Sequence, residues 1–229
     1  MSALKWPSVL GAVIVVAATA LPGQAAPISF TTRAAFDAAL PETVENWESY
    51  APGTIFNNGT TTNGITYSSS SGNAIVHDSW TGTTPTHTLG RSTNGVLDDF
   101  ADIILPGHTI TFSFGTSIGA FGIDALMNTE LDGLLKGVTN TGETVFSFYN
   151  PFGFSKFQFL GFRTDLPFTS IAVSTVSETN SYVLDTLRYV PFAQLPAAPT
   201  SVPEPASLLL VGTGIAAAVR RARQHRRLS

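Results

Sequence analysis

Few side chains in this sequence could do chemistry, and the first candidates are two carboxylates far apart in the chain. Glu48 follows Trp47 early in the sequence, and Asp185 lies in the segment YVLDTLRY near the end of the central part. Ca²⁺ takes several oxygen ligands, and carboxylates commonly supply them. A fold whose first and last strands are neighbours would let Glu48 and Asp185 form a structural Ca²⁺ site. The alternative is that each carboxylate accepts hydrogen bonds from backbone amides or pairs with Arg188.

A second candidate site is the polar segment VHDSWTGTTPTHT, which contains His77, Asp78 and Trp80. An aromatic ring in a loop can stack on a sugar, and the two polar neighbours could hydrogen-bond its hydroxyls. The segment therefore predicts a glycan contact. The alternative is that the Trp80 ring folds back over the edge of the sheet, because tryptophan is usually highly buried.

The other polar clusters point to turns and loops. His77 and His87 are ten residues apart, which matches no standard metal-ligand spacing. Asp98, Asp99 and Asp102 predict a solvated acidic turn, with a cation site as the alternative. The threonine runs, such as Thr60 to Thr62, lack the regular repeat of an ice-binding surface, and we expect turns there.

No catalytic set can be assembled from the sequence. The chain has no cysteine and no G-x-S-x-G segment, so a thiolate nucleophile is excluded and a nucleophile elbow is not indicated. Glycosidases use two carboxylates, but spacing alone identifies no such pair. We therefore expect a protein that is not an enzyme, with a secreted carbohydrate-active enzyme of glycoside hydrolase type as the alternative.

The charge of the central part excludes one class of partner. Between Ala26 and Ser201 there are six Lys and Arg residues against fifteen Asp and Glu residues, a formal charge of −9. Nucleic-acid affinity depends largely on Lys and Arg contacts to phosphates, so we expect no nucleic-acid partner. Cations and neutral, hydroxyl-rich polymers suit this composition better.

Short β-type segments dominate the central part and must position these side chains. They are rich in β-branched and aromatic residues and are bounded by Gly, Asn, Pro or Ser. HTITFSF places Ile110, Phe112 and Phe114 on one face, whereas SKFQFLGF places Phe157, Phe159 and Phe162 on one face only if a bulge lies at Leu160-Gly161. TTRAAFDAAL predicts one short helix from about Arg33 to Leu40, with Thr32 as its N-cap. The fold class is therefore all-β, an antiparallel, jelly-roll-like β-sandwich over residues 27–191 with one short N-terminal helix.

Both ends of the chain carry segments that we expect to lie outside this sandwich. Residues 1–25 have a positive start, an apolar stretch and small residues before the expected cleavage after Ala25, as in a secretory signal peptide. Residues 192–201 are a Pro/Ala-rich linker.

The C-terminal residues 202–229 have three parts in a fixed order. First comes Val202-Pro203-Glu204-Pro205, and then fourteen uncharged residues, 206–219, which as a helix would cover about 21 Å of a hydrocarbon core about 30 Å thick. We expect a single short transmembrane helix there. A basic tail, residues 220–229, would stop transfer on the cytoplasmic side; its arginines are Arg220, Arg221, Arg223, Arg226 and Arg227.

This order of parts resembles the PEP-CTERM sorting signal of exported bacterial proteins, a tail that has also been called an ice-binding protein C-terminal domain. The resemblance implies signal peptidase and an exosortase as processing partners, with cleavage near Pro203-Glu204-Pro205. It also implies brief residence in the inner membrane, and then the cell surface or the extracellular space.

The central part shows a second, looser resemblance. GAFGID, LGF before PFTSIAV, and YVLDTLRY are similar to segments of the β-sandwich ectodomains of PEP-CTERM proteins, which are akin to carbohydrate-binding jelly rolls. In such folds the first and last strands often meet, and some bind Ca²⁺ there. We therefore expect a non-enzymatic surface or matrix protein associated with exopolysaccharide.

Overall fold

The computed structural model describes residues 26–78, 87–97, 103–128, 134–149, 157–175 and 181–197. The described elements are, in chain order, β1 (Ile28–Phe30), α1 (Arg33–Ala39), β2 (Thr43–Glu45), β3 (Ile55–Phe56), β4 (Thr60–Thr62), β5 (Ile65–Ser69), β6 (Asn73–His77), β7 (Thr88–Ser92), β8 (Thr109–Asn128), β9 (Leu134–Thr139), β10 (Thr144–Tyr149), β11 (Gln158–Thr175), β12 (Ser181–Pro191) and η2 (Phe192–Gln194). The expected signal peptide, the Asp98–Asp102 turn and the C-terminal signal lie outside the described residues. No helix in the described ranges is long and apolar enough to cross a membrane.

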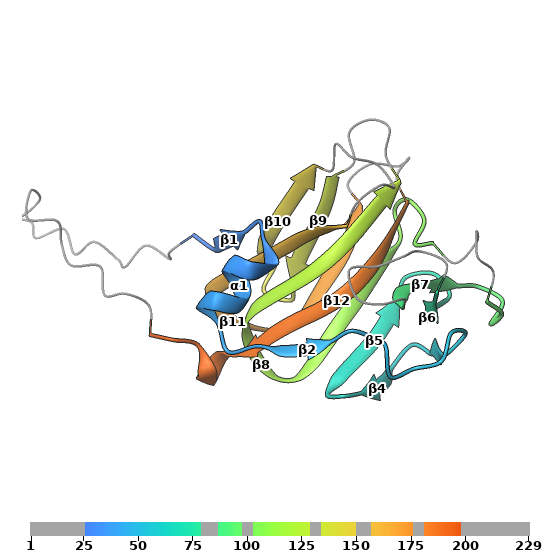
Figure 1. Cartoon of the computed structure of the whole chain (residues 1–229), viewed down its shortest axis with the longest axis horizontal. Coiled ribbons are helices and arrows are strands. Elements are labelled where there is room, and N and C mark those ends of the chain that lie inside the picture. The colour runs from blue at the N-terminus through green and yellow to red at the C-terminus, as the bar shows by residue number, and fades with distance from the viewer. Residues whose placement is uncertain are drawn as a thin grey trace, which may run out of the picture.

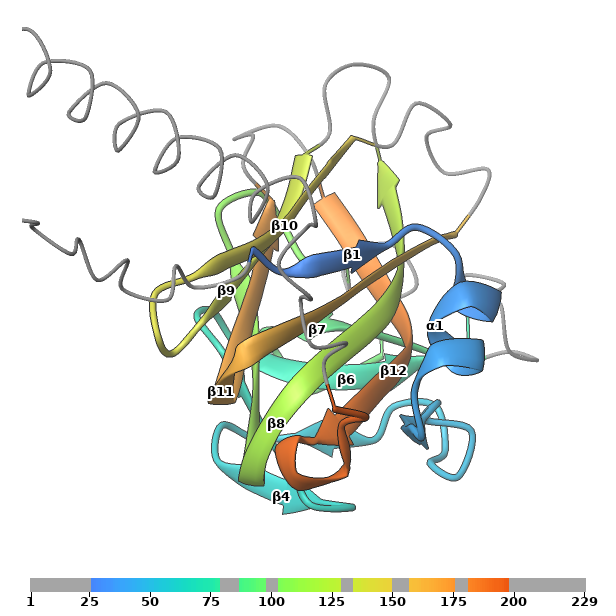
Figure 2. The ribbon, with the colours of Figure 1, turned by 90° about the vertical axis from the view of Figure 1, so that its left-hand side faces the viewer.

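All the described strand pairs are antiparallel, and two long strands join the two layers of the fold. The first half of β8 pairs with β5 and with the second half of β11, whereas its second half pairs with β12 and with the first half of β11. One layer therefore contains β4, β5, β9 and β10, and the other contains β1, β2, β12, β7, β6 and β3. Figure 1 shows the arrangement of the elements, and Figure 2 shows α1 against the second layer, with β9 and β10 on the opposite side of the molecule. The predicted all-β, antiparallel β-sandwich is confirmed.

The main core lies between the two layers. Ile110, Phe112 and Phe114 are all buried in it, as the alternation in HTITFSF predicts. Phe121 and Phe162 continue the row of rings, with centroids 6.2 Å apart. This core accounts for most of the large buried side chains among the described residues.

A second, smaller core lies under α1 and corrects the prediction for SKFQFLGF. Phe159 packs there against Phe36, whereas Phe162 faces the main core. The pairing of β11 with β8 runs without interruption from Gln158 to Arg163, so there is no bulge at Leu160-Gly161. The bulge was wrong because α1 covers the outer face of β11, so aromatic residues can be buried on both faces of this strand.

The Thr60–Thr62 run also differs from the prediction. It forms strand β4, paired with β5, rather than a turn. The turn that joins the two strands lies at Asn63 and Gly64, both of which have positive φ angles. Asparagine and glycine tolerate this left-handed region better than β-branched threonine does. The turn therefore falls on Asn63 and Gly64, and the threonines form the strand before it.

Candidate functional site

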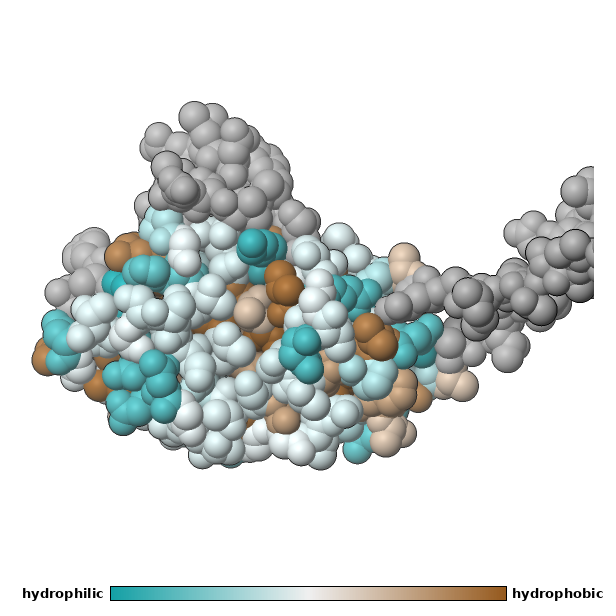
Figure 3. All heavy atoms as spheres, turned by 180° about the vertical axis from the view of Figure 1, so that it is seen from behind, coloured by the Kyte–Doolittle hydropathy of each residue, from teal (hydrophilic) through white to brown (hydrophobic). Residues whose placement is uncertain are grey.

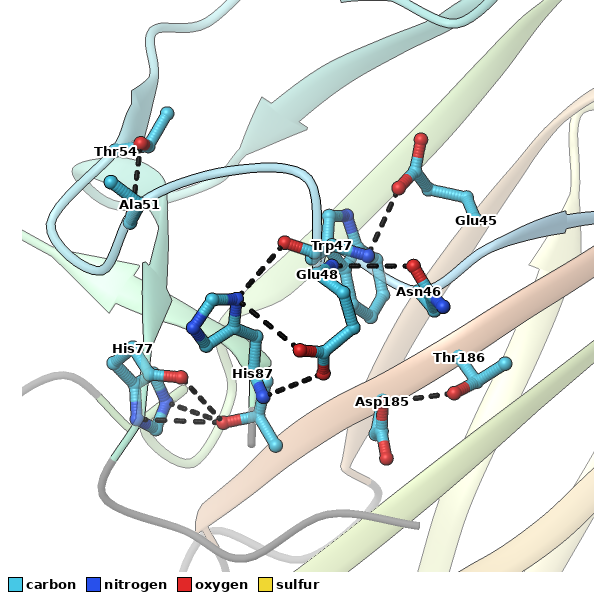
Figure 4. Close-up of polar contacts among 11 residues, drawn as sticks. Glu45, Asn46, Trp47, Glu48, Ala51, Thr54, His77, His87, Asp185 and Thr186 are labelled. Carbon is cyan, nitrogen blue, oxygen red and sulfur yellow. Dashed lines mark hydrogen bonds and ion pairs between the residues drawn. The ribbon is translucent and has the colours of Figure 1, made fainter. Parts of the chain in front are cut away.

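The corner that holds Glu48 is built by the chain as it leaves β2. Trp47 has a positive φ of 58° and is fully buried. Its backbone N–H donates to Glu45 Oε1 at 3.0 Å, and its indole Nε1–H donates to the Tyr67 hydroxyl at 3.0 Å. These two bonds hold a conformation that is rare for a bulky residue, and the side chain of the next residue, Glu48, points toward His87 (Figure 4).

Glu48 connects this corner to the start of β7. Its Oε1 accepts the backbone N–H of His87 at 2.9 Å, and its Oε2 lies 3.6 Å from His87 Nδ1. The same Nδ1 lies 3.3 Å from the Trp47 carbonyl oxygen. Figure 4 shows the carboxylate and the imidazole facing each other. Glu48 therefore accepts a backbone amide, as one of the two predicted alternatives has it.

Asp185 occupies the point on β12 where the neighbouring strand changes. Leu184 pairs with Leu89 of β7, and Leu187 pairs with Glu45 of β2. Between them a bulge at Thr186, with φ of 39°, interrupts the pairing with β8. Asp185 is 0% exposed, and the Thr186 hydroxyl donates to its Oδ1 at 2.9 Å. Glu48 and Asp185 thus lie on either side of the same junction of β2, β7 and β12.

The fit of this junction to Ca²⁺ is incomplete in the described residues. Ca²⁺ takes about six to eight oxygen ligands, and two carboxylates supply only some of them. Within residues 26–78, 87–97 and the later described ranges, no three His, Asp or Glu side chains lie close enough together to hold a metal ion. The Ca²⁺ site stays a prediction.

The three residues of the predicted glycan contact, His77, Asp78 and Trp80, do not share one environment in the structure. His77 ends β6 and is fully buried, with the Thr88 hydroxyl 3.2 Å from its Nε2. Its ring is therefore not accessible to a sugar in this structure. Asp78 is exposed, and Trp80 lies outside the described residues. The β-type segment NAIVH, which ends at His77, is confirmed as strand β6.

A charged cluster under α1 was not predicted. Asp124 of β8 is buried and receives a hydrogen bond from Arg33 Nη2 at 2.7 Å. Arg188 of β12 lies 3.5 Å from the same carboxylate through Nη1, and its Nε lies 3.2 Å from oxygens of both Asp37 and Glu42. Arg33 lies 91 positions from Asp124 in the sequence, and Arg188 lies 64 positions from it. Sequence spacing therefore gave no signal for these contacts.

Burial sets the ionisation of this cluster. Loss of hydration raises the pKa of Asp124 to about 6; Arg33 and Arg188 oppose the rise, and the nearby Asp185 adds to it. Burial also raises the pKa of Glu42 to about 7, with Asp37 adding to the rise and Arg188 opposing it. The cluster is a structural one, because α1 and its N-terminal arginine cover the Asp124 carboxylate.

Comparison with known structures finds similar β-rich domains at low identity. The cleaved adhesin domain of Lys-gingipain is 12% identical, with a TM-score of 0.42 over 66% of this chain and 99% of that one. A family 29 carbohydrate binding module complexed with mannohexaose is 13% identical, with a TM-score of 0.36 over 66% and 91%. The catalytic unit of a thermostable alpha-1,3-glucanase from Streptomyces thermodiastaticus is 11% identical, with a TM-score of 0.38 over 71% and 28%.

The comparison that identifies part of the chain concerns its C-terminal end. A search of curated proteins found no match. Residues 201–224 match the family model of the PEP-CTERM protein-sorting motif. The match contains Val202-Pro203-Glu204-Pro205, the apolar stretch and the first three arginines of the basic tail. The chain therefore carries a PEP-CTERM protein-sorting motif, the sorting signal of an exported protein.

Proposed function

We propose that this chain is a non-enzymatic component of the cell surface or extracellular matrix that associates with exopolysaccharide after removal of both its end segments. The match of residues 201–224 to the PEP-CTERM motif carries the proposal. In it, signal peptidase removes residues 1–25, the 206–219 helix and the basic tail hold the chain in the inner membrane, and an exosortase cleaves near Pro203-Glu204-Pro205. What reaches the surface is the sandwich of residues 27–191, whose layers we infer to be jelly-roll-like, with its linker.

Mass spectrometry of the protein from its native host tests the processing. The mature surface protein should lack the residues before Ala26 and those after about Pro205, and a strain without exosortase should retain the tail. Pro205→Ala should leave the tail uncut, whereas the matched linker variant Pro199→Ala should be processed normally. A surface pool that is intact through Ser229 would contradict exosortase processing.

The binding half of the proposal needs its own experiment. The processed protein should sediment with the exopolysaccharide of its native host and should release no reducing ends from it. Release of reducing ends that is absent from a mock preparation would assign the chain to the alternative class, the carbohydrate-active enzymes. Failure to sediment with any fraction would contradict the association with polysaccharide.

A further inference from the structure

The two ends of the sandwich leave it at the same place. Ile28, at the start of β1, is the third residue after the expected signal-peptide cleavage, and it is directly paired with Arg163 of β11. Arg163 Nη2 donates to the carbonyl oxygen of Pro196, beyond the end of β12, at 2.6 Å. One arginine therefore joins the first and the last described parts of the chain. We call the region of Ile28, Arg163 and Pro196 the exit end.

The chain is held against the sandwich after it leaves β12. Residues 192–196, which we call the strap, begin with η2, and Leu195 packs on the smaller core under α1. A Cβ atom at Gly119 of β8 would lie 2.3 Å from Leu195 Cδ1 and 2.7 Å from Phe192 Cδ2, so this glycine leaves the room that the strap needs. These contacts and the Arg163 hydrogen bond fix the point from which the chain departs.

The strap shortens the connection between the sandwich and the uncharged stretch 206–219. Nine residues, 197–205, follow the held Pro196, and at about 3.6 Å per residue they reach at most about 32 Å. Without the strap the connection would begin after Pro191 and would reach about 50 Å. A compact domain of this size is about 40 Å across. The sandwich with its strap in place therefore cannot turn its far side toward a membrane that holds the tail, whereas a sandwich without the strap could.

The exit end also carries apolar side chains that suit a lipid surface. Ile28 is 53% exposed and Phe192 is 37% exposed, and removal of such surface from water is favourable. Figure 1 shows the start of β1 and the orange end of the described chain on the left, with β6 and β7 on the right, and Figure 2 looks onto the exit end. In Figure 3, seen from behind, this end lies on the right and shows brown and tan apolar atoms among hydrophilic ones.

We propose that the exit end is the membrane-facing surface of the sandwich and rests on the lipid headgroups while the tail anchors the chain, an inference that rests on the anchored precursor of the proposed function. The strap imposes this orientation, because it keeps the connection shorter than the sandwich is wide. Both segments that the proposed function places in the membrane, 1–25 and 206–229, then lie on the membrane side. The strap also keeps the Pro203-Glu204-Pro205 motif within nine residues of the sandwich.

The chain has no cysteine, so single labelled cysteines can test this orientation. Ile28→Cys and, separately, Val96→Cys receive a fluorophore in the full chain with its tail, taken from a strain without exosortase and checked by mass spectrometry for loss of the signal peptide. Val96 is the matched control: it is an exposed aliphatic residue that follows β7, and β11, β8 and β12 separate β7 from β1. The chain is reconstituted into vesicles of phosphatidylethanolamine and phosphatidylglycerol with a headgroup-linked quencher, and flotation selects the anchored chains.

We expect the Ile28 label to lose most of its fluorescence and the Val96 label to keep it. Equal quenching of the two labels in floated chains would overturn the proposal and leave the proposed function standing. Preferential quenching at Ile28 that appears only after exosortase is added would also overturn it, because the partner would then be a protein. A chain that does not float with the vesicles would contradict the anchored precursor, and the proposed function and this inference would fail together.

Release of the strap gives a second readout. One hydrogen bond contributes little on its own, so Arg163→Gln is combined with Leu195→Ser, and the difference in quenching between the two labels should shrink. Six Gly and Ser residues inserted after Ala197 should have the same effect and leave the contacts of the strap in place. Lys136→Gln removes the same charge from β9, in the other layer, and should leave the difference unchanged. A full difference in the insertion variant would show that the length of the connection does not set the orientation.

Discussion

Two glycines show how single residues fix the position of α1. Gly122 and Gly161 are directly paired on β8 and β11. A Cβ atom at Gly122 would lie 2.5 Å from the Phe159 ring, and one at Gly161 would lie 2.7 Å from Phe159 and 2.8 Å from Phe36. The two rings rest on this glycine pair, with centroids 5.5 Å apart. The absence of side chains here is therefore what allows α1 to approach the sheet.

Gly122→Ala should destabilise the fold by about 1–3 kcal/mol, the usual cost of extra atoms in a packed core. The Phe159 ring cannot move away freely, because Phe36 packs against it. Gly115→Ala is the matched control, since a Cβ there would meet nothing within 4 Å. Urea denaturation measures both variants, and equal stability of the two would show that the rings are not held against the glycines.

The raised pKa values at Asp124 and Glu42 predict how stability depends on pH. A raised carboxyl pKa means that the folded state holds its proton more tightly than the unfolded state. The resulting stabilisation is full below the ordinary pKa values of 3.8 and 4.5, and it is lost as the pH rises through about 6 for Asp124 and about 7 for Glu42. The free energy of unfolding should therefore fall between pH 4 and pH 7, by at most about 1.4 kcal/mol per pH unit for each proton.

Chemical denaturation at several pH values checks this dependence. Asp124→Asn should flatten the slope, because one of the two groups no longer titrates. Asp165→Asn, at an exposed position, should leave the slope in place and control for the general relief of acidic repulsion. Equal slopes in both variants would assign the pH dependence to net charge rather than to the cluster.

At the scale of elements, the junction of β2, β7 and β12 carries the Ca²⁺ prediction. If Ca²⁺ binds the native state alone, stability should rise by about 2.7 kcal/mol when free Ca²⁺ is a hundredfold above its dissociation constant. The rise should vanish in the double variant Glu48→Gln and Asp185→Asn. Thermal melting at matched ionic strength measures it, with Mg²⁺ as the control ion because Mg²⁺ demands a tighter octahedral shell.

The outcome separates the two roles of Glu48. Equal melting shifts with both ions, or an undiminished Ca²⁺ shift in the double variant, would leave Glu48 only as the acceptor of the His87 amide. Since that hydrogen bond joins the exit of β2 to the start of β7, Glu48→Gln alone should still lower the melting temperature modestly.

The elements also show what the sequence could and could not predict. Alternation identified the strand with Ile110, Phe112 and Phe114, because one face of that strand is core and the other is open. It failed at Phe159 and Phe162, where both faces are covered, since period-2 reasoning assumes one buried face. The Asp124 cluster was missed for a different reason: it depends on the register between distant strands, which single-strand patterns do not contain.

At the scale of the whole molecule, the basic tail is predicted to retain the chain in the membrane until it is cleaved. Replacing Arg220, Arg221, Arg223, Arg226 and Arg227 with glutamine should impair retention before cleavage, because positive charge is what holds a short span with its end on the cytoplasmic side. Cell fractionation should then find uncut protein outside the membrane. Normal processing and retention of this variant would show that the apolar stretch alone suffices.

The long strands β8 and β11 have a mechanical consequence for the sandwich. They run through both layers, so the layer of β4, β5, β9 and β10 and the strand β12 are parts of one continuous hydrogen-bonded unit. A pull along β12 would act parallel to its antiparallel neighbour β8 and load the many ladder bonds between the two strands together. Such shear is resisted far better than peeling, in which the bonds break one after another.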